Sequence, residues 1–208
     1  YDAYLKKTIT VHKKTKQKES FWMEIFQILS NPSLELSFLD SFNDNTSASE
    51  VMMLLLQLEN NFIDANLSYN LFNAEYNKQG VNATDLSIPS KYSHRLIFIY
   101  AKSFVQALDN FQRILKILST YPTLPNGIPE IENKLLEFFP DLRGVRNSMQ
   151  HMEDRIRGLD NKNKPLKLQP INDGFINAPN GAYAFDNLHD TKFKTTMSNG
   201  YYGEIDIY

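Results

Sequence analysis

"KYSHRLIFIYAKSFVQALDNFQRILKIL", residues 91–118, is the stretch that decides the fold. Its apolar residues recur at spacings of three and four, which is the repeat of a helix with one buried face. The members of this stripe are Leu96, Ile97, Tyr100, Phe104, Ala107, Leu108, Phe111, Leu115 and Leu118. An apolar face of this length must be covered by other helices, so the stretch predicts a helical bundle.

The preceding chain supplies such partners. Residues 49–77 predict another long helix, and the loop 78–90 separates the two. Its stripe is made of Leu55, Leu58, Phe62, Ala65, Tyr69 and Phe72. Further upstream, residues 20–29 predict a short helix that Asn31-Pro32 ends, residues 34–42 predict a further helical turn, and residues 43–49 predict a loop with N-cap candidates.

The following chain adds a short helix at residues 129–142, with Pro129 in the favoured first turn. After Pro140 a last helix is expected from about 141 to 158, with Gly158 as its C-terminal cap. From there the chain is rich in Asn, Pro and Gly, and strand-like pieces follow at residues 182–188, 192–197 and 201–208. The Asn-Gly pair within residues 197–201 predicts a hairpin turn.

The predicted fold is therefore mainly α: a bundle of four to five helices with a small C-terminal antiparallel β hairpin or meander. We expect two parts, residues 1–158 as the helical bundle and residues 159–208 as an irregular linker plus a β appendage packed on the bundle. At 208 residues and 42% hydrophobic composition, the chain can bury a normal core.

Composition narrows the function. The chain has no cysteine, which excludes disulfides, thiol nucleophiles and cysteine-based zinc sites. Net charge is −2, so no overall basic field indicates nucleic-acid binding. Six lysines between residues 5 and 18 form either a solvated element or an arm that touches phosphates. No apolar run reaches the length of a membrane span, and the first residues do not read as a signal peptide, so we expect a soluble cytoplasmic protein.

The last predicted helix, "GVRNSMQHMEDRIRG" at residues 144–158, carries the candidate site. On an ideal helix one stripe holds Arg143, Asn147, His151 and Arg155; a second holds Arg146, Gln150 and Asp154; and the apolar Val145, Met149, Met152 and Ile156 dock the helix. Arg146 and His151 lie roughly 140° apart around the axis. To grip one phosphate they need either an irregular backbone near Gly144 or a second copy facing the first across a two-fold axis.

These residue types suit RNA cleavage. Arginine holds phosphate in a bidentate grip, and histidine can accept and donate a proton near neutral pH. RNA supplies its own nucleophile, the 2′-hydroxyl, so no metal is obligatory. The alternative is an exposed helix decorated by acid–arginine pairs, with Arg157 facing Glu153 or Asp154.

The stretch "RNSMQH", residues 146–151, resembles the R-N-x-x-x-H signature of the HEPN superfamily, and the helical layout of residues 20–158 agrees. The resemblance implies a homodimer with a composite cleft and metal-independent ribonuclease activity, as in toxin–antitoxin or phage-defence systems. It implies catalytic Arg146 and His151, supported by Asn147. Around them we predict a substrate-binding set of Arg143, Gln150 and Arg155. No cofactor and no metal are expected, and an antitoxin or sensor protein is a possible partner.

One departure limits the transfer. Some HEPN proteins have Tyr two residues after the histidine and transfer nucleotides; here that position is Glu153, which does not support this chemistry. Other members are non-catalytic scaffolds, so an RNA- or protein-binding dimerisation module is the second hypothesis. The remaining histidines, His12, His94 and His189, are too scattered to predict zinc. Tyr201, Tyr202 and Phe193 either stack on bases or, as we favour, pack the β segment on the bundle.

Overall fold

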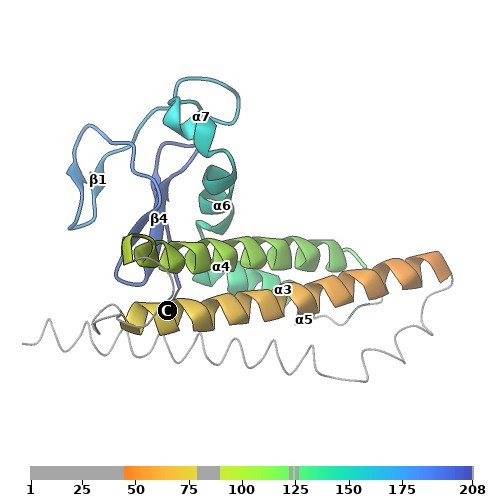
Figure 1. The fold of residues 1–208 in the computed structure, drawn as a ribbon. Helices are drawn as coiled ribbons and strands as arrows, with labels where there is room; N and C mark the ends of the chain where they lie inside the picture. The colour runs from red at the N-terminus through yellow and green to blue at the C-terminus, as the bar shows by residue number, and fades with distance from the viewer. Residues whose placement is uncertain (1–44, 79–89, 122–123, 125–126, 208) are drawn as a thin grey trace, which may run out of the picture. The chain divides into compact units, whose positions relative to one another are not determined.

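A computed structural model of the chain describes residues 45–78, 90–121, 124 and 127–207, of which residues 45–47 and 90–93 are described by their backbone only. This part of the chain holds five helices and five short strands, which confirms the mainly α class with a C-terminal β element (Figure 1). No helix in the described part is both long and apolar enough to cross a bilayer. The elements predicted within residues 20–42, the lysines between 5 and 18, and His12 lie outside the described residues.

The two long helices are confirmed as α3 (Asn45–Lys78) and α4 (Ser90–Leu118), and the short one as α5 (Gly127–Phe138). α3 begins within residues 43–49, where a loop was expected. Most residues of the two predicted stripes are buried, as amphipathic packing requires. The described residues divide into two compact units, and each long helix contributes to both.

The first unit combines the described residues of 45–59 with those of 114–138. Its core is aliphatic and draws on all three helices. The buried side chains are Val51, Leu58, Leu115, Leu118, Leu124, Ile128, Ile131 and Leu135. Because all are apolar, this unit is held by burial of hydrocarbon surface.

The second unit combines residues 60–113 with residues 139–207 and carries the motif. Here α3 and α4 run antiparallel, and the ring of Phe62 lies 6.2 Å from that of Phe111. Phe139, just before the motif helix, meets Phe104 of α4 edge-on at 6.0 Å. Aromatic pairs of this kind therefore attach the motif segment to the middle of α4.

The single helix predicted for residues 141–158 is wrong. The structure has α6 (Leu142–Gln150) and α7 (Met152–Ile156), separated by His151, whose φ of −113° and ψ of 41° are not helical. The predicted cap is confirmed. Gly158 has φ +72°, and its N–H and that of Leu159 donate to the carbonyls of Arg155 and Asp154. These two bonds form a Schellman motif, which needs a left-handed residue such as glycine.

The C-terminal strands confirm the predicted meander. β3 (Asn187–His189), β4 (Lys192–Thr196) and β5 (Tyr202–Asp206) form an antiparallel sheet in that order, and β1 (Ile171–Asn172) pairs with β2 (Asn177–Ala178). Gly200 closes the β4–β5 hairpin with φ +84°, while its neighbour Asn199 keeps negative φ. The turn is thus a three-residue loop with a glycine at the left-handed position.

The sheet packs directly on α6 (Figure 1). Met197 fills the space between Gly144 of α6 and Gly203 of β5; a β-carbon on either glycine would lie only 2.2 or 2.5 Å from its sulfur. Asp141 Oδ2 accepts the N–H of Glu204 at 3.1 Å. Gly144 thus allows close packing of α6 on the sheet. The irregular backbone that was considered near Gly144 lies at His151 instead.

A buried charge network ties the β1–β2 turn to the sheet. Lys194, 4% exposed, lies 3.0 Å from Asp173 Oδ2 and 3.2 Å from Glu204 Oε2. Asp173 Oδ1 also accepts the N–H of Ile176 at 2.7 Å and of Phe175 at 3.0 Å. The bond from Ile176 is the largest of the effects that lower the pKa of Asp173 to about 2. The carboxylate is therefore favoured strongly in the folded chain.

This network predicts a pH dependence of stability. The pKa of Asp173 falls from 3.8 to about 2 on folding, so its contribution is complete above pH 3.8 and is lost as pH falls towards 2. Asp173→Asn should be less stable than the parent at pH 6, and the difference should shrink between pH 4 and pH 2. Urea unfolding at several pH values measures it. A difference that stays constant over this window would contradict the assignment.

Candidate functional site

Arg146 of α6 is turned towards α4 and is buried. Its Nε lies 3.1 Å from Oδ2 of Asp109, whose side chain is completely buried. Arg113, one turn further along α4 and 41% exposed, places its own Nε 3.2 Å from the same oxygen. Neither N–H is directed at the carboxylate, so these contacts are ion pairs and not aligned hydrogen bonds.

The cluster carries a surplus of positive charge. Two guanidinium groups share one carboxylate, and Arg143 acts on Arg146 with a third positive charge. Burial is the main effect lowering the pKa of Arg146; Asp109 opposes it, and Arg113 and Arg143 add to it. Arginine remains protonated in proteins despite such shifts. A cluster with net positive charge fits a phosphate group.

The polar residues beside Arg146 also make defined hydrogen bonds. Asn147 Oδ1 accepts a hydrogen bond from Arg146 Nη1 at 3.2 Å, so the two motif neighbours are coupled. Gln150 is exposed and donates from Nε2 to Gln106 Oε1 of α4 at 3.0 Å. A groove of about 610 Å³ along α3 and α4 has Gln106 and Met149 in its lining. This groove opens beside the motif and gives it an approach from solvent.

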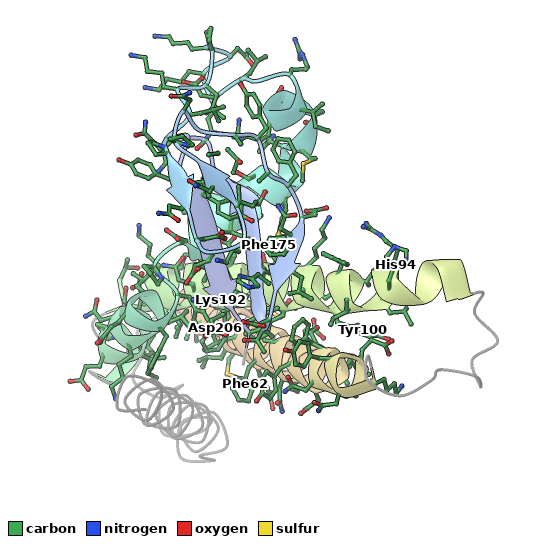
Figure 2. All side chains as sticks on the ribbon, turned by 90° about the vertical axis from the view of Figure 1, so that its left-hand side faces the viewer. Phe62, His94, Tyr100, Phe175, Lys192 and Asp206 are labelled. Atoms are coloured by element: carbon green, nitrogen blue, oxygen red, sulfur yellow. The ribbon has the colours of Figure 1, made fainter. Side chains whose placement is uncertain are left out.

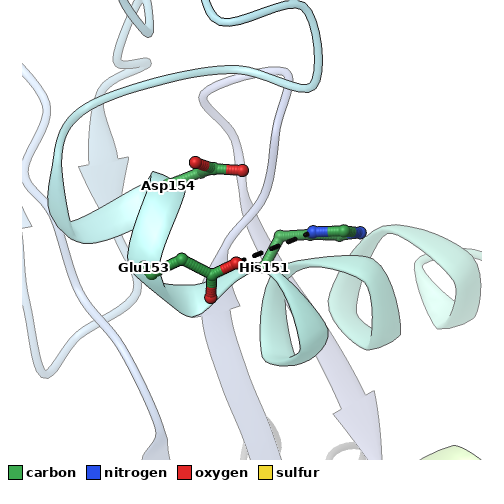
Figure 3. Close-up of side chains that lie close together, drawn as sticks. All are labelled: His151, Glu153 and Asp154. Carbon is green, nitrogen blue, oxygen red and sulfur yellow. Dashed lines mark ion pairs between the residues drawn. The ribbon is translucent and has the colours of Figure 1, made fainter.

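His151 lies at the break between α6 and α7, and its side chain is 53% exposed. Its backbone N–H still donates to the carbonyl of Asn147 at 3.0 Å, which closes the last turn of α6. The imidazole Nδ1 lies 4.0 Å from Glu153 Oε1 (Figure 3). Within one chain, therefore, the motif histidine faces solvent while Arg146 faces α4.

The predicted stripe through Arg143, Asn147, His151 and Arg155 does not form one face. Arg143 and His151 are exposed, but Arg155 is completely buried and donates to the carbonyl of Leu159 and to Asn161 Oδ1. We therefore withdraw Arg155 from the substrate-binding set. The predicted docking face is also incomplete, because Val145 is fully buried whereas Ile156 is 68% exposed.

Sequence reasoning missed Asp109 and Arg113. A signal was present: Asp109 lies one turn after Val105 and next to Leu108, on the buried face of a helix whose other residues there are mostly apolar. A charge in such a position demands a partner of opposite sign. The sequence did not indicate that the partner would be Arg146.

The structure gives the burial and the contacts of the other aromatic and histidine candidates. Phe193 is fully buried, Tyr202 lies under Lys194 at 5.8 Å, and Tyr201 is 56% exposed. His189 lies in β3, and its ring stacks on that of Phe175 at 5.2 Å. Phe175, which is labelled in Figure 2, is itself exposed. The predicted surface pair is seen between Arg157 and Asp154 at 3.7 Å.

No family model, no curated protein and no solved structure matches this chain. Its function must therefore be argued from the motif and from the residues that surround it. These residues are a positively charged arginine cluster, an asparagine coupled to it and an exposed histidine one turn away.

Proposed function

We propose that the chain is a metal-independent endoribonuclease that acts as a homodimer, with Arg146, Asn147 and His151 as its catalytic residues. The observation that carries the proposal is the exposed imidazole of His151, which lies one helical turn from a cluster of arginines that share the carboxylate of Asp109 in the described part of the chain. A solvent-facing histidine can reach a substrate, and the cluster can hold the substrate's phosphate. Arg143 and Gln150, both exposed, would contact the RNA backbone.

The second copy is needed because Arg146 and His151 face different surroundings in one chain. Across a two-fold axis, two motif helices supply two histidines and two arginine clusters to one cleft. One imidazole takes the proton of the 2′-hydroxyl as its oxygen forms a bond to phosphorus. The bond from phosphorus to the 5′-oxygen breaks, and the imidazolium of the other copy protonates that oxygen. The arginines stabilise the charged pentacoordinate phosphorus, and a 2′,3′-cyclic phosphate remains.

The biological setting follows from the resemblance of the motif to HEPN proteins. We propose a cytoplasmic toxin or phage-defence effector, whose activity an antitoxin or sensor protein restrains. An effector that degrades cellular RNA must be kept inactive until it is needed, and such a partner supplies that control.

A second candidate function is a non-catalytic dimerisation module that binds RNA or protein. The observation that favours it is that Arg146 already has partners within the fold. Arg146 is buried, forms an ion pair with Asp109 through Nε and donates a hydrogen bond to Asn147 through Nη1. A guanidinium with these contacts stabilises the fold in addition to any ligand that it binds. In the module, His151 and Arg143 would form part of a binding surface without turnover.

The test is incubation of the purified chain with total RNA and with tRNA in EDTA. We expect cleavage with 2′,3′-cyclic phosphate ends. His151→Ala should lower the rate by about 10²-fold or more, since that is the usual contribution of general acid–base catalysis. His151 is exposed and makes no side-chain cap hydrogen bond, so its loss should leave folding intact. His94→Ala, at another exposed histidine, is the matched control.

Three results would count against the enzyme. Absence of cleavage in every RNA would favour the binding module, and so would equal activity of His151→Ala and the parent. Loss of activity in EDTA that Mg²⁺ restores would contradict the metal-independent mechanism. RNA binding retained by His151→Ala without cleavage would support the enzyme.

A further inference from the structure

We propose that His151, Glu153 and Asp154 form a binding site for a divalent transition-metal ion of the zinc class. Each residue offers one ligand atom, and the three atoms lie within 4.8 Å of one another (Figure 3). Binding itself is independent of the proposed ribonuclease activity. Its consequence rests on that activity: an ion held by His151 occupies the imidazole and stops RNA cleavage.

The break in the helix creates this cluster. In a continuous helix, residues two apart point to nearly opposite sides, so His151 and Glu153 could not share a ligand. At His151 the chain leaves helical geometry, and α7 starts with the two acids at its second and third residues. The imidazole and the two carboxylates then lie on one side of the junction (Figure 3).

The spacing of the atoms suits a small cation. Zinc bonds to histidine and carboxylate atoms are about 2.0–2.2 Å long, which keeps tetrahedral ligand atoms roughly 3.3 Å apart. His151 Nδ1 and Glu153 Oε1 are separated by 4.0 Å, so a small side-chain rotation closes the gap. His151 and Glu153 are more than half exposed, which makes that rotation easy. Asp154, 24% exposed, lies 3.7 Å from Arg157 and also interacts electrostatically with Arg155.

The ligand types select the ion. One imidazole with two carboxylates suits Zn²⁺ or a neighbouring transition ion, whereas Mg²⁺ prefers oxygen ligands and keeps its waters. Three protein ligands leave the fourth position of a tetrahedral ion open to water. Two carboxylates next to an exposed imidazole also provide negative charge that attracts the cation.

The experiment is isothermal titration calorimetry of ZnCl₂ into the chain without an affinity tag, in the absence of RNA. We expect one zinc ion per chain. His151→Ala should remove binding, and Glu153→Gln and Asp154→Asn should each weaken it by about tenfold or more, at least the effect of losing a supporting residue around a metal. His189→Ala is the matched control: His189 lies 4.0 Å from Asp190 and forms no such three-residue cluster with other described residues. MgCl₂ should give no comparable heat.

Zinc that fails to bind, or that binds His151→Ala as tightly as the parent, overturns the site. Cleavage assays test the consequence separately. Zinc should stop RNA cleavage at the concentration that fills the site, and EDTA should restore it. Saturated zinc with undiminished cleavage overturns the inhibitory role. A chain that binds zinc but cleaves no RNA keeps the site and contradicts the proposed ribonuclease.

Discussion

Replacing Asp109 by Asn should destabilise the chain by about 3–5 kcal/mol, the usual effect of removing one partner of a buried ion pair. Asp109 is completely buried and faces Nε of both Arg146 and Arg113. The neutral amide leaves Arg146 buried without a counter-charge, and Arg113 and Arg143 then repel it. Urea unfolding followed by circular dichroism measures the change as a shift in midpoint at constant slope.

Two controls separate the buried pair from charge in general. Arg113→Met should cost less than about 1 kcal/mol, because Arg113 is 41% exposed and its ion pair is screened. The double replacement Asp109→Leu with Arg146→Met should recover most of the stability, since an apolar pair needs no desolvated charges. A loss below about 1 kcal/mol for Asp109→Asn would show that Arg146 does not depend on this carboxylate.

Replacing Arg155 by Ala should cost about 3–5 kcal/mol. Among the described residues Arg155 is the largest completely buried side chain, and its guanidinium donates hydrogen bonds to the carbonyl of Leu159 and to Asn161 Oδ1. Truncation leaves a cavity and removes hydrogen bonds of a charged donor, each worth about 1.5–3 kcal/mol. Arg155→Lys should not restore the loss, because an ammonium cannot reproduce the fork of the guanidinium. The free energy of urea unfolding measures both variants.

The companion variants test the bonding partner. Asn161→Ala should cost about 1–2 kcal/mol and couple to Arg155→Ala in a double-mutant cycle. Lys162→Ala, at an exposed neighbour, should change stability by less than about 0.5 kcal/mol. An Arg155→Ala variant as stable as the parent would contradict a structural role for this arginine and return it to the candidate RNA contacts.

Burial of Arg155 also explains the break in the motif helix. On a continuous helix Arg143, His151 and Arg155 share one stripe, so all three would be exposed or buried together. The loop at residues 159–161 supplies the two oxygen atoms that accept hydrogen bonds from the buried guanidinium of Arg155. Ending α6 at Gln150 and starting α7 at Met152 buries Arg155 while His151 stays exposed. Sequence periodicity could not predict this, because it assumes an unbroken helix.

The sequence by itself determined the local elements. Apolar spacing along residues 49–77 and 91–118 defined two long helices, and the glycines at 158 and 200 marked a helix end and a hairpin turn, because each signal acts through neighbouring residues. The motif at residues 146–151 was likewise readable, and its function remains our proposal. Only the tertiary structure paired Asp109 with Arg146 and placed His151 beside Glu153 and Asp154. Both depend on how the chain packs across distant segments or bends at one residue, which no local pattern of residue types records.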